Sequence, residues 1–414
     1  MKRSWLLTGL AIYLLLAAVI FPFFIGVPVT LMFGSDAIGY SKPAINLLLH
    51  EFYSLDGLIP FFDREPGMSF FLVPIYFIFG IESVVGLSLV QIVMLFLAAW
   101  YFCSQAERRI GARAAGLCFL LLLSSGSVFH TIFSAYRECL ALSLLMLFSG
   151  LFFSSEIARA WWKNVLMGLL FGFLILTYYP FIFFPPVLLF IFWIRRLSLR
   201  SAVTIMLICY VVVGLWAFRN YLQSGKFRVI DDRRTAVMWY VRGEQTEHVH
   251  GLEPILCLWA EYVSRDWTER SHQCSFNGLM HEKWPDGVDP ETDYTQVIHD
   301  GQAKIMADIP NYLWFSIVDI IELHLPFLGG GWSHAYNIYA SATMLLLYVG
   351  FFLGFPALFR RDAMLCLLLI GYNTAIFILT DATPRYLLPV IFWYAFIAGI
   401  GYDRALKRLS KYFS

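Results

Sequence analysis

Long apolar runs recur along the whole chain, and they constrain its fold more than any other feature. Hydrophobic residues make up 59% of the sequence and charged residues only 14%, whereas about a quarter of the residues in a soluble domain are charged. A helix that crosses about 30 Å of hydrocarbon needs about 20 mainly apolar residues. Runs of that length predict an all-α integral membrane protein.

About ten transmembrane helices are expected from this length criterion. They lie near residues 6–33, 83–103, 114–131, 137–155, 164–180, 181–194, 201–218, 336–358, 363–380 and 386–403. The run at 181–194 is short for a full crossing, so with its neighbour it is expected to form a tight or partly re-entrant hairpin around Tyr178-Tyr179-Pro180. The first run is too long for a cleaved signal peptide.

Two further apolar stretches, 67–80 and 312–328, are predicted to be interfacial helices rather than crossings. The second stretch contains Asp319, Glu322 and His324, and ionisable groups are costly in lipid. Counting it as a crossing would also place Arg360 and Arg361 outside, against the positive-inside bias.

Basic residues predict the orientation of the helices. Cytoplasmic loops carry an excess of Lys and Arg, and starting with Lys2 and Arg3 inside gathers more than half of the 30 basic residues on one side. These are Arg108, Arg109, Arg113, Arg159, Lys163, Arg195, Arg196, Arg200, Arg360, Arg361, Arg404, Lys407, Arg408 and Lys411. Both termini are therefore expected to be cytoplasmic.

This topology predicts three parts. Residues 1–218 form an N-terminal membrane part with a first outer loop at about 34–82, residues 219–335 form an extracytoplasmic region, and residues 336–414 form the C-terminal membrane helices. Its part from Arg219 to Asn311 holds five of the nine histidines, and the region is expected to be a modest loop domain with an interfacial helix. No nucleotide-binding loop is present, and no nucleic-acid partner is expected.

The seven cysteines divide into two groups. Five lie in or at the ends of apolar runs, where a thiol packs as a small apolar side chain. Cys257 and Cys274 lie in the outer region, where an oxidising environment permits a disulfide. Whether these two are paired stays open at this point.

Asp36 is the leading candidate for a catalytic residue. It follows the first apolar run in Gly34-Ser35-Asp36-Ala37-Ile38-Gly39-Tyr40, so its carboxylate is expected at the membrane surface, within reach of a lipid-linked substrate. The alternative is an acid that simply ends the first span.

Other charged residues are predicted at the outer ends of the helices. Glu65 lies in Asp63-Arg64-Glu65-Pro66-Gly67, which also fits a plain turn before an interfacial helix. Arg137 and Glu138 open the fourth span. They either line a substrate pocket, or Arg137 snorkels and Glu138 pairs with it.

Arg219 and Arg385 are expected to emerge at the outer face. Guanidinium groups bind phosphate oxygens bidentately and stay charged at any working pH, which suits a lipid diphosphate or phosphodiester. The alternative is anchoring to lipid head groups.

His248-Val249-His250 is a weaker candidate. An extended segment would place both imidazoles on one side, next to Glu244 or Glu247, which is an unspecific metal-binding arrangement.

Four segments in this order resemble the GT-C superfamily of membrane glycosyltransferases, of the kind related to protein mannosyltransferases and the lipid A aminoarabinose transferase. They are Asp36-Ala37-Ile38-Gly39-Tyr40 with Lys42–Tyr53, Arg64-Glu65-Pro66-Gly67-Met68 leading to Phe79-Gly80, Trp216-Ala217-Phe218-Arg219-Asn220-Tyr221 with Gly225-Lys226-Phe227, and Arg385-Tyr386-Leu387-Leu388-Pro389. The resemblance covers essentially the whole chain.

The resemblance implies transfer of a sugar from a polyprenyl-phosphate donor to an extracytoplasmic glycan, lipid or protein acceptor. Asp36 is the implied general base, and Arg219 and Arg385, with Arg64 or a divalent metal ion, are implied to stabilise the leaving phosphate. The residues expected to bind substrates are Tyr40, Arg64, Glu65, Arg137, Glu138, Arg219, Arg385 and Tyr386. No other cofactor is implied, and the metal ligands are unknown.

The chain also departs from the family pattern. Ala37 follows Asp36 where the family often has a second acid, which argues against a mannosyltransferase proper. The sequence ends soon after the tenth predicted span, which favours transfer of a single sugar over an oligosaccharyltransferase. No glycosylation sequon occurs in the predicted outer loops, and this favours a bacterial or archaeal source, with a bacterial inner membrane as the expected location.

Two other functions compete with this interpretation. A transporter of lipid-linked saccharides should show inverted repeats and ionisable groups near the bilayer midplane, and neither is evident in the sequence. A polysaccharide polymerase would depend on arginines of large outer loops without needing Asp36.

Overall fold

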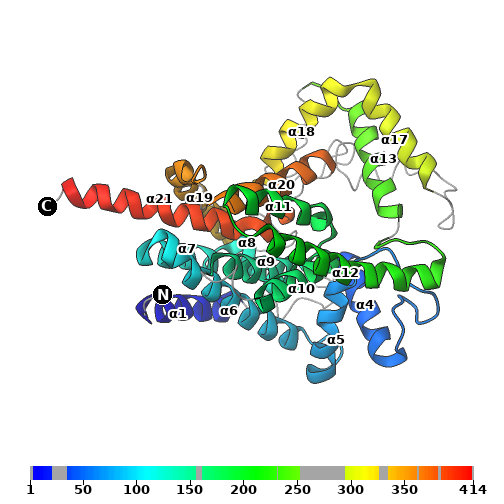
Figure 1. Cartoon of the computed structure of the whole chain (residues 1–414), viewed down its shortest axis with the longest axis horizontal. Helices are drawn as coiled ribbons and strands as arrows, with labels where there is room; N and C mark the ends of the chain where they lie inside the picture. Colours follow the sequence, from blue (N-terminus) through cyan, green and yellow to red (C-terminus); the bar gives the residue numbers. More distant parts are fainter. Residues whose placement is uncertain are drawn as a thin grey trace. The chain divides into compact units, whose positions relative to one another are not determined.

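The computed structural model describes residues 3–20, 35–154, 161–230, 232–251, 294–325, 334–360, 363–380 and 384–412 (Figure 1). Within these ranges the secondary structure is helical, and the β-type contact found there is an isolated antiparallel bridge between Ser54 and Pro60. The all-α prediction is confirmed. Cys257 and Cys274, whose pairing the sequence left open, lie outside the described residues.

The chain divides into two compact units. The first consists of Met1–Val229, Pro326–Asn373 and Leu388–Ser414, and the second of Ile230–Leu325 and Thr374–Leu387. Each unit is described by itself below. The division at residues 218 and 335 stays a prediction, and the second unit additionally contains the segment that carries Arg385 and Tyr386.

The first unit contains most of the helices. They are α1 (Arg3–Ile20), α4 (Ser35–His50), α5 (Gly67–Phe79), α6 (Val84–Ile110), α7 (Ala112–Leu123), α8 (Gly126–Ile132), α9 (Arg137–Phe153), α10 (Trp161–Thr177), α11 (Pro185–Ile194), α12 (Leu199–Ser224), α19 (His334–Gly354), α20 (Met364–Thr380), whose last turns belong to the second unit, and α21 (Ile391–Tyr412). Short 3-10 helices are η1 (Tyr179–Phe183), η3 (Phe355–Ala357) and η5 (Pro384–Val390).

Four helical segments among the described residues are long and apolar enough to cross a membrane. They are Val84–Ile110, Leu199–Ser224, Tyr336–Ala357 and Pro384–Tyr412. The pair α7 and α8 adds a fifth, bent by 56°. All five coincide with predicted spans, and several of the others correspond to shorter apolar helices. The number ten stays a prediction.

The bend between α7 and α8 is stabilised by α19. Carbonyl groups freed where a helix breaks need other partners. Tyr339 donates its hydroxyl to the carbonyl of Ser124 at 2.5 Å, and Tyr336 donates to the carbonyl of Gly126. Two tyrosines of one helix thus satisfy the backbone at the bend.

Aromatic side chains from α6, α9 and α21 form a core of the first unit. Phe102 of α6 lies 4.9 Å from Phe392 and 5.3 Å from Trp393 of α21, both edge-on, and Phe153 of α9 lies 5.6 Å from Trp393. Edge-to-face contacts at such centroid distances are favourable beyond the area they bury. The described cysteines are buried free thiols, as the packing interpretation predicted.

Glycines allow α19 and α21 to approach closely. A Cβ atom on Gly401 would lie 2.1 Å from the carbonyl oxygen of Gly350, and one on Gly354 would lie 2.1 Å from the carbonyl oxygen of Ile397. Small residues permit such backbone contact between membrane helices.

Both chain ends lie on one side of the first unit. The start of α1 and the end of α21 lie at the end of this unit that is opposite to α4 and α5 (Figure 1). There Asp403 of α21 accepts from Arg113 of α7 and from Lys407, each at 2.5 Å. The cytoplasmic orientation of both termini stays a prediction.

The second unit is built from α13 (Asp232–His248), α17 (Thr295–Ala307), α18 (Ile309–Leu323) and the end of α20. Ala236, Tyr294 and Val297 form its small buried core, with Tyr240 and Ile298 packed against it. α18 occupies much of the apolar stretch that the sequence assigned to an interfacial helix.

Replacing Gly401 with alanine should lower the stability of the first unit, because the added methyl group meets the backbone of α19. Overpacking of this kind costs about 1–3 kcal/mol, so the thermal unfolding temperature in detergent should fall. Gly371→Ala is the matched control, since a Cβ atom there meets open space. An equal change in both variants would contradict the close approach of α19 and α21.

Candidate functional site

Asp36 and Tyr40 lie at the start of α4, which follows the first apolar run. Asp36 is in the first turn of this helix, where the backbone is described and the side chain is not. Tyr40 follows four residues later, so both positions share one helix face. The Tyr40 side chain is buried, and its carbonyl accepts a hydrogen bond from the Ser69 hydroxyl at 2.9 Å.

Arg64 lies across this helix. Its guanidinium carbon is 5.8 Å from the centre of the Tyr40 ring. A Cβ atom on Gly39 would lie 3.2 Å from the Cγ and Nε atoms of Arg64, so glycine at this position makes room for the arginine. The helix-start motif and the Arg64-Glu65 motif are thereby in direct contact.

The centre of the site is a buried ion pair between Glu65 and Arg137. An Arg137 Nη atom donates to a carboxylate oxygen of Glu65, and the two residues are only 3% and 1% exposed. Pro66 precedes the first residue of α5, and Gly67 allows α5 to start directly against Thr177 at the end of α10. This packing holds Glu65 inward, which a plain surface turn would not do.

Arg137 does not snorkel, and its ion pair is with Glu65 rather than with Glu138. Its guanidinium carbon lies 4.6 Å from the centre of the Tyr178 ring, and it is close enough to interact electrostatically with Tyr40. Glu138 is 3% exposed, and among the described residues no hydrogen bond or ion pair meets its carboxylate. The site therefore contains one acid paired with Arg137 and a second buried acid that also interacts electrostatically with this arginine.

Tyr53 connects this cluster to Arg219. Its hydroxyl donates to the carbonyl of Arg64 at 3.5 Å, while its own carbonyl accepts from Arg219 at 3.4 Å. Burial raises the pKa of Tyr53 above its ordinary value, so the phenol stays protonated at any physiological pH. Sequence reasoning missed this residue.

Arg219 is held among aromatic rings near the end of α12. Its guanidinium carbon lies 4.8 Å from the ring centre of Trp216, 5.5 Å from that of Tyr53 and 5.7 Å from that of Phe62. One Nη atom donates to the side-chain oxygen of Asn220 at 2.9 Å. The guanidinium is thus oriented without an ion-pair partner among the described residues, which suits an anion-binding group.

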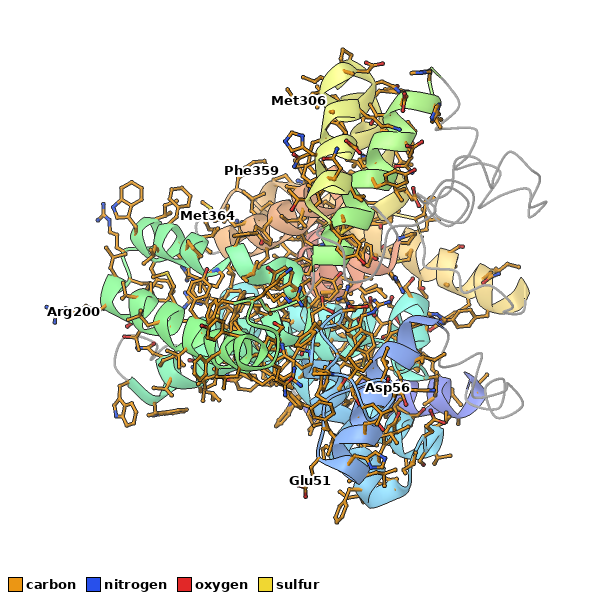
Figure 2. All side chains as sticks on the ribbon, turned by 90° about the vertical axis from the view of Figure 1, so that its right-hand side faces the viewer. Glu51, Asp56, Arg200, Met306, Phe359 and Met364 are labelled. Carbon is orange, nitrogen blue, oxygen red and sulfur yellow. The ribbon has the colours of Figure 1, made fainter. Side chains whose placement is uncertain are left out.

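The loop between α4 and α5 also carries exposed acids. Glu51 and Asp56 are exposed (Figure 2). Asp56 accepts the backbone N–H groups of Ile59 and Leu58 at 2.9 and 2.8 Å, and these bonds hold the pKa of its carboxyl below the usual value. Asp56 therefore has a local structural role, unlike the buried Glu65.

Arg385 and Tyr386 belong to the second unit. An Arg385 Nη atom lies 3.3 Å from the Tyr386 hydroxyl, and the guanidinium carbon lies 5.1 Å from the ring centre. The Tyr386 ring stacks on Phe377 of α20 with 4.4 Å between ring centres. Both predicted residues are therefore in contact with each other and with the end of α20.

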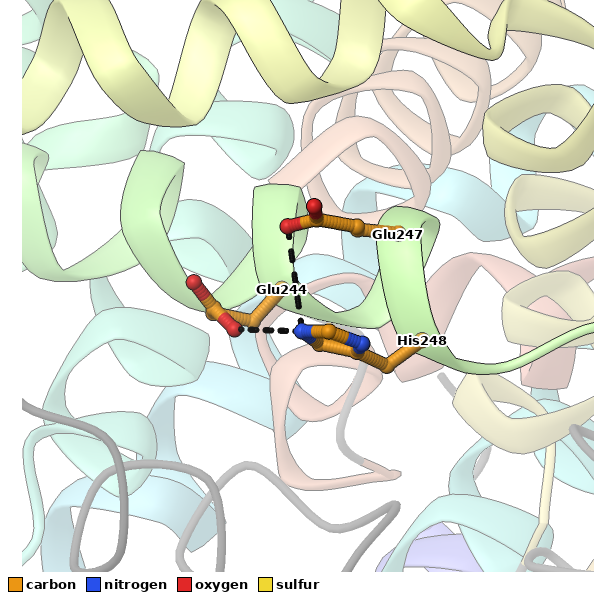
Figure 3. Close-up of side chains that lie close together, drawn as sticks. All are labelled: Glu244, Glu247 and His248. Carbon is orange, nitrogen blue, oxygen red and sulfur yellow. Dashed lines mark ion pairs between the residues drawn. The ribbon is translucent and has the colours of Figure 1, made fainter.

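The predicted arrangement of His248 and His250, with both imidazoles on one side of an extended segment, is wrong. His248 is the last residue of α13 rather than part of an extended segment, and the Nδ1 atom of His250 contacts Asn311 at 3.0 Å. His248 Nε2 lies instead 3.2 Å from Glu244 and 3.7 Å from Glu247 (Figure 3).

Glu244, Glu247 and His248 have the residue types of a metal site, with ligand atoms within 4.8 Å of one another. However, Lys304 of α17 bonds to both carboxylates, at 2.6 Å from Glu247. Partial burial alone would lower the pKa of Lys304, but its hydrogen bonds to Glu244 and Glu247 raise it above the usual value. The cluster is an ion-pair network that joins α13 to α17.

Two tyrosines were not selected from the sequence, although both belong to the site. Tyr53 and Tyr178 are buried against the arginines. In the sequence they look like the tyrosines that many membrane proteins carry in an interfacial belt. Their positions in the sequence could have identified them. Tyr53 ends the segment Lys42–Tyr53 of the first motif, and Tyr178 lies at a break in an apolar run.

Comparisons by sequence give no relatives: no model of a protein family matches the chain, and no curated protein is significantly similar to it. Comparisons by structure do. The archaeal oligosaccharyltransferase AglB from Archaeoglobus fulgidus, in complex with an inhibitory peptide and a dolichol-phosphate, matches 99% of this chain and 51% of its own at 12% identity and a TM-score of 0.53. The apo form of the Archaeoglobus fulgidus oligosaccharyltransferase matches 100% and 52% at 13% identity and a TM-score of 0.52.

ArnT from Cupriavidus metallidurans, bound to undecaprenyl phosphate, matches 98% of this chain and 79% of its own at 16% identity. Its TM-score of 0.44 is too low to support an argument. The chain spans about half the length of the oligosaccharyltransferases, and over that length it shares their fold. The resemblance inferred from the motifs is confirmed at the level of the fold.

Replacing Arg137 with methionine should strongly destabilise the first unit, because it leaves the Glu65 carboxylate buried without its partner. Breaking a buried ion pair from one side costs about 3–5 kcal/mol. The double variant Arg137→Met with Glu65→Leu should recover most of the loss in a thermal unfolding experiment. A single variant as stable as the wild type would contradict the burial of this pair.

Replacing Lys304 with alanine should lower the unfolding temperature of the protein, because two neighbouring carboxylates lose their shared cation. Zn²⁺ should restore part of the loss, since Glu244, Glu247 and His248 are suitable zinc ligands. Differential scanning fluorimetry with and without Zn²⁺ measures both effects. If the wild type gained as much from Zn²⁺ as the variant, the ion-pair interpretation of this cluster would be wrong.

Proposed function

We propose that the protein transfers a sugar from a polyprenyl-phosphate donor to an extracytoplasmic glycan, lipid or protein acceptor. The observation that carries the proposal is the buried cluster of Glu65, Arg137, Tyr40 and Tyr178, with Glu138 next to Arg137. Tyr40 lies in α4, whose first turn contains Asp36. Buried charges are costly, and ionisable groups at the lipid boundary are usually functional. The fold is shared with an oligosaccharyltransferase that was solved with a dolichol-phosphate, and this supports glycosyl transfer from a polyprenyl-phosphate donor.

Asp36 is proposed as the general base. Its carboxylate accepts the proton of an acceptor hydroxyl while that oxygen forms a bond to the anomeric carbon of the donor sugar. The bond between the anomeric carbon and the phosphate oxygen breaks, and the lipid phosphate leaves with the electron pair. Tyr40, one helical turn after Asp36, is proposed to line the same pocket.

Arg219 is proposed to stabilise the charge that develops on the leaving phosphate. Preorganised cations at the position where charge appears lower the barrier without reorganising. The rings of Trp216, Tyr53 and Phe62 orient this guanidinium before the donor binds. Arg64 is proposed as a further contact of the same phosphate. Arg385, with Tyr386 beside it, is proposed as a phosphate-binding residue of the second unit.

Glu65 and Arg137 are proposed to act mainly as a fixed wall of the pocket, because they already neutralise each other. Glu138, buried next to Arg137, is proposed to accept hydrogen bonds from sugar hydroxyls. Its oxygens also fit a divalent metal ion; in that case EDTA would abolish transfer, and otherwise transfer would be unaffected.

The proposed location is a bacterial inner membrane, with both termini cytoplasmic and the site outside. The support is the excess of Lys and Arg in the loops predicted to be cytoplasmic, together with the start of α1 and the end of α21, which lie at the end of the first unit opposite to α4 and α5 (Figure 1). Membrane lipids would surround the apolar faces of the spanning helices.

Replacing Asp36 with asparagine should reduce transfer by about 100- to 10,000-fold, because the amide keeps the shape but cannot accept the proton. The measurement is transfer of label from a panel of radiolabelled polyprenyl-phosphate sugars by the purified protein in liposomes. Asp56→Asn is the matched control, since Asp56 is an exposed acid of the same loop that only accepts backbone hydrogen bonds.

Near-full activity of Asp36→Asn would remove Asp36 from its proposed role. No transfer by the wild type from any donor, with labelled lipid appearing on the other leaflet, would support a transporter instead.

A further inference from the structure

A second buried ion pair lies in the second unit, between Arg242 of α13 and Asp319 of α18. The two side chains are only 3% and 8% exposed. The rings of Tyr312 and Phe315 lie 5.4 and 5.5 Å from the guanidinium carbon of Arg242. A buried ion pair by itself adds little to the free energy of unfolding. Stability alone therefore does not explain why this pair is present.

The pair holds the C-terminal end of α20. The Nη2 atom of Arg242 that contacts Asp319 also donates to the carbonyl of Ile378 at 2.9 Å, and the hydroxyl of Tyr312 donates to the carbonyl of Leu379 at 3.0 Å. Carbonyls in the last turn of a helix have no partner within it, and a cation there also interacts favourably with the helix dipole.

Contacts continue from this helix end to Arg385. Phe377, next to Ile378, stacks on the Tyr386 ring with an interplanar angle of 19°. Tyr386 in turn contacts the guanidinium group of Arg385. Arg242 is therefore linked to Arg385 through one helix end and one pair of stacked rings, all within the same unit.

We propose that Arg242 is a positioning residue for the anion-binding arginine Arg385. Its pairing with Asp319 fixes the position of the Arg242 guanidinium, which in turn holds the C-terminal end of α20. The stacked rings of Phe377 and Tyr386 then fix the position of Arg385. The inference rests on the proposed function, in which Arg385 contacts the phosphate of a polyprenyl donor.

Arginine suits this role better than an apolar residue of similar volume. Its planar group presents several donors in a fixed geometry. Nη2 of Arg242 lies within hydrogen-bonding distance of Asp319, Ser316 and the carbonyl of Ile378, and Nη1 donates to Gln245 at 3.3 Å. Apolar replacement of the ion pair would preserve packing, but it would leave the carbonyl of Ile378 without this donor.

The test is equilibrium binding of undecaprenyl phosphate to the purified full-length protein in detergent, with the unfolding temperature measured in parallel. The variants are Arg385→Ala, the double variant Arg242→Met with Asp319→Leu, and all three substitutions together. The control is Lys304→Met with Glu244→Gln, which removes an ion pair of the same unit that does not contact α20.

The inference predicts that the Arg242/Asp319 double variant keeps its unfolding temperature but binds undecaprenyl phosphate about 10-fold more weakly, the equivalent of about 1.4 kcal/mol. Adding Arg385→Ala should weaken binding little further, because residues that act as a unit are not additive. The control should bind as the wild type does.

Unchanged affinity of the double variant, beside weakened Arg385→Ala, would overturn the positioning role while leaving the proposed function intact. Unchanged affinity of Arg385→Ala itself would overturn the positioning role and the proposed contact of Arg385. A wild type that does not bind undecaprenyl phosphate would overturn the proposed function and, with it, this inference.

Discussion

The ion pair between Glu65 and Arg137 is the interaction on which the proposed site depends. It joins the segment before α5 to the start of α9, and Tyr178 closes it from the end of α10. Because both groups are buried, neither can leave without exposing the other to an apolar environment. The pair therefore fixes the start of α5, the start of α9 and the end of α10 relative to one another, next to α4, whose first turn contains Asp36.

Aromatic rings provide a second kind of order. Tyr53 lies between the ion pair and Arg219, and the rings around Arg219 hold its guanidinium without neutralising it. One arginine in this unit is thus paired with a buried acid, and another is oriented by aromatic rings and is proposed to bind the donor phosphate. The second unit repeats the division, with Arg242 paired to Asp319 and Arg385 resting on Tyr386.

The fold was largely predictable from the sequence, because apolar runs and caps are local signals. The partners of the charged residues were not. Arg137 was predicted either to line a substrate pocket or to snorkel with Glu138 paired to it. Adjacent residues on a helix do not face each other, and the partner Glu65 lies far away in the sequence. Tyr53 and Tyr178 were missed for a related reason, since burial against a cation depends on packing that periodicity does not encode. The predicted arrangement of His248 and His250 on one side of an extended segment was wrong, because α13 continues as a helix to His248.

The most direct test of the proposed site is a structure of the protein determined with undecaprenyl phosphate in a lipid nanodisc. The account predicts the phosphate within hydrogen-bonding distance of the Arg219 guanidinium, on the side of the first unit that carries Tyr40 and the Glu65–Arg137 pair. Phosphate bound at the opposite end, near Arg113 and Lys407, would contradict it.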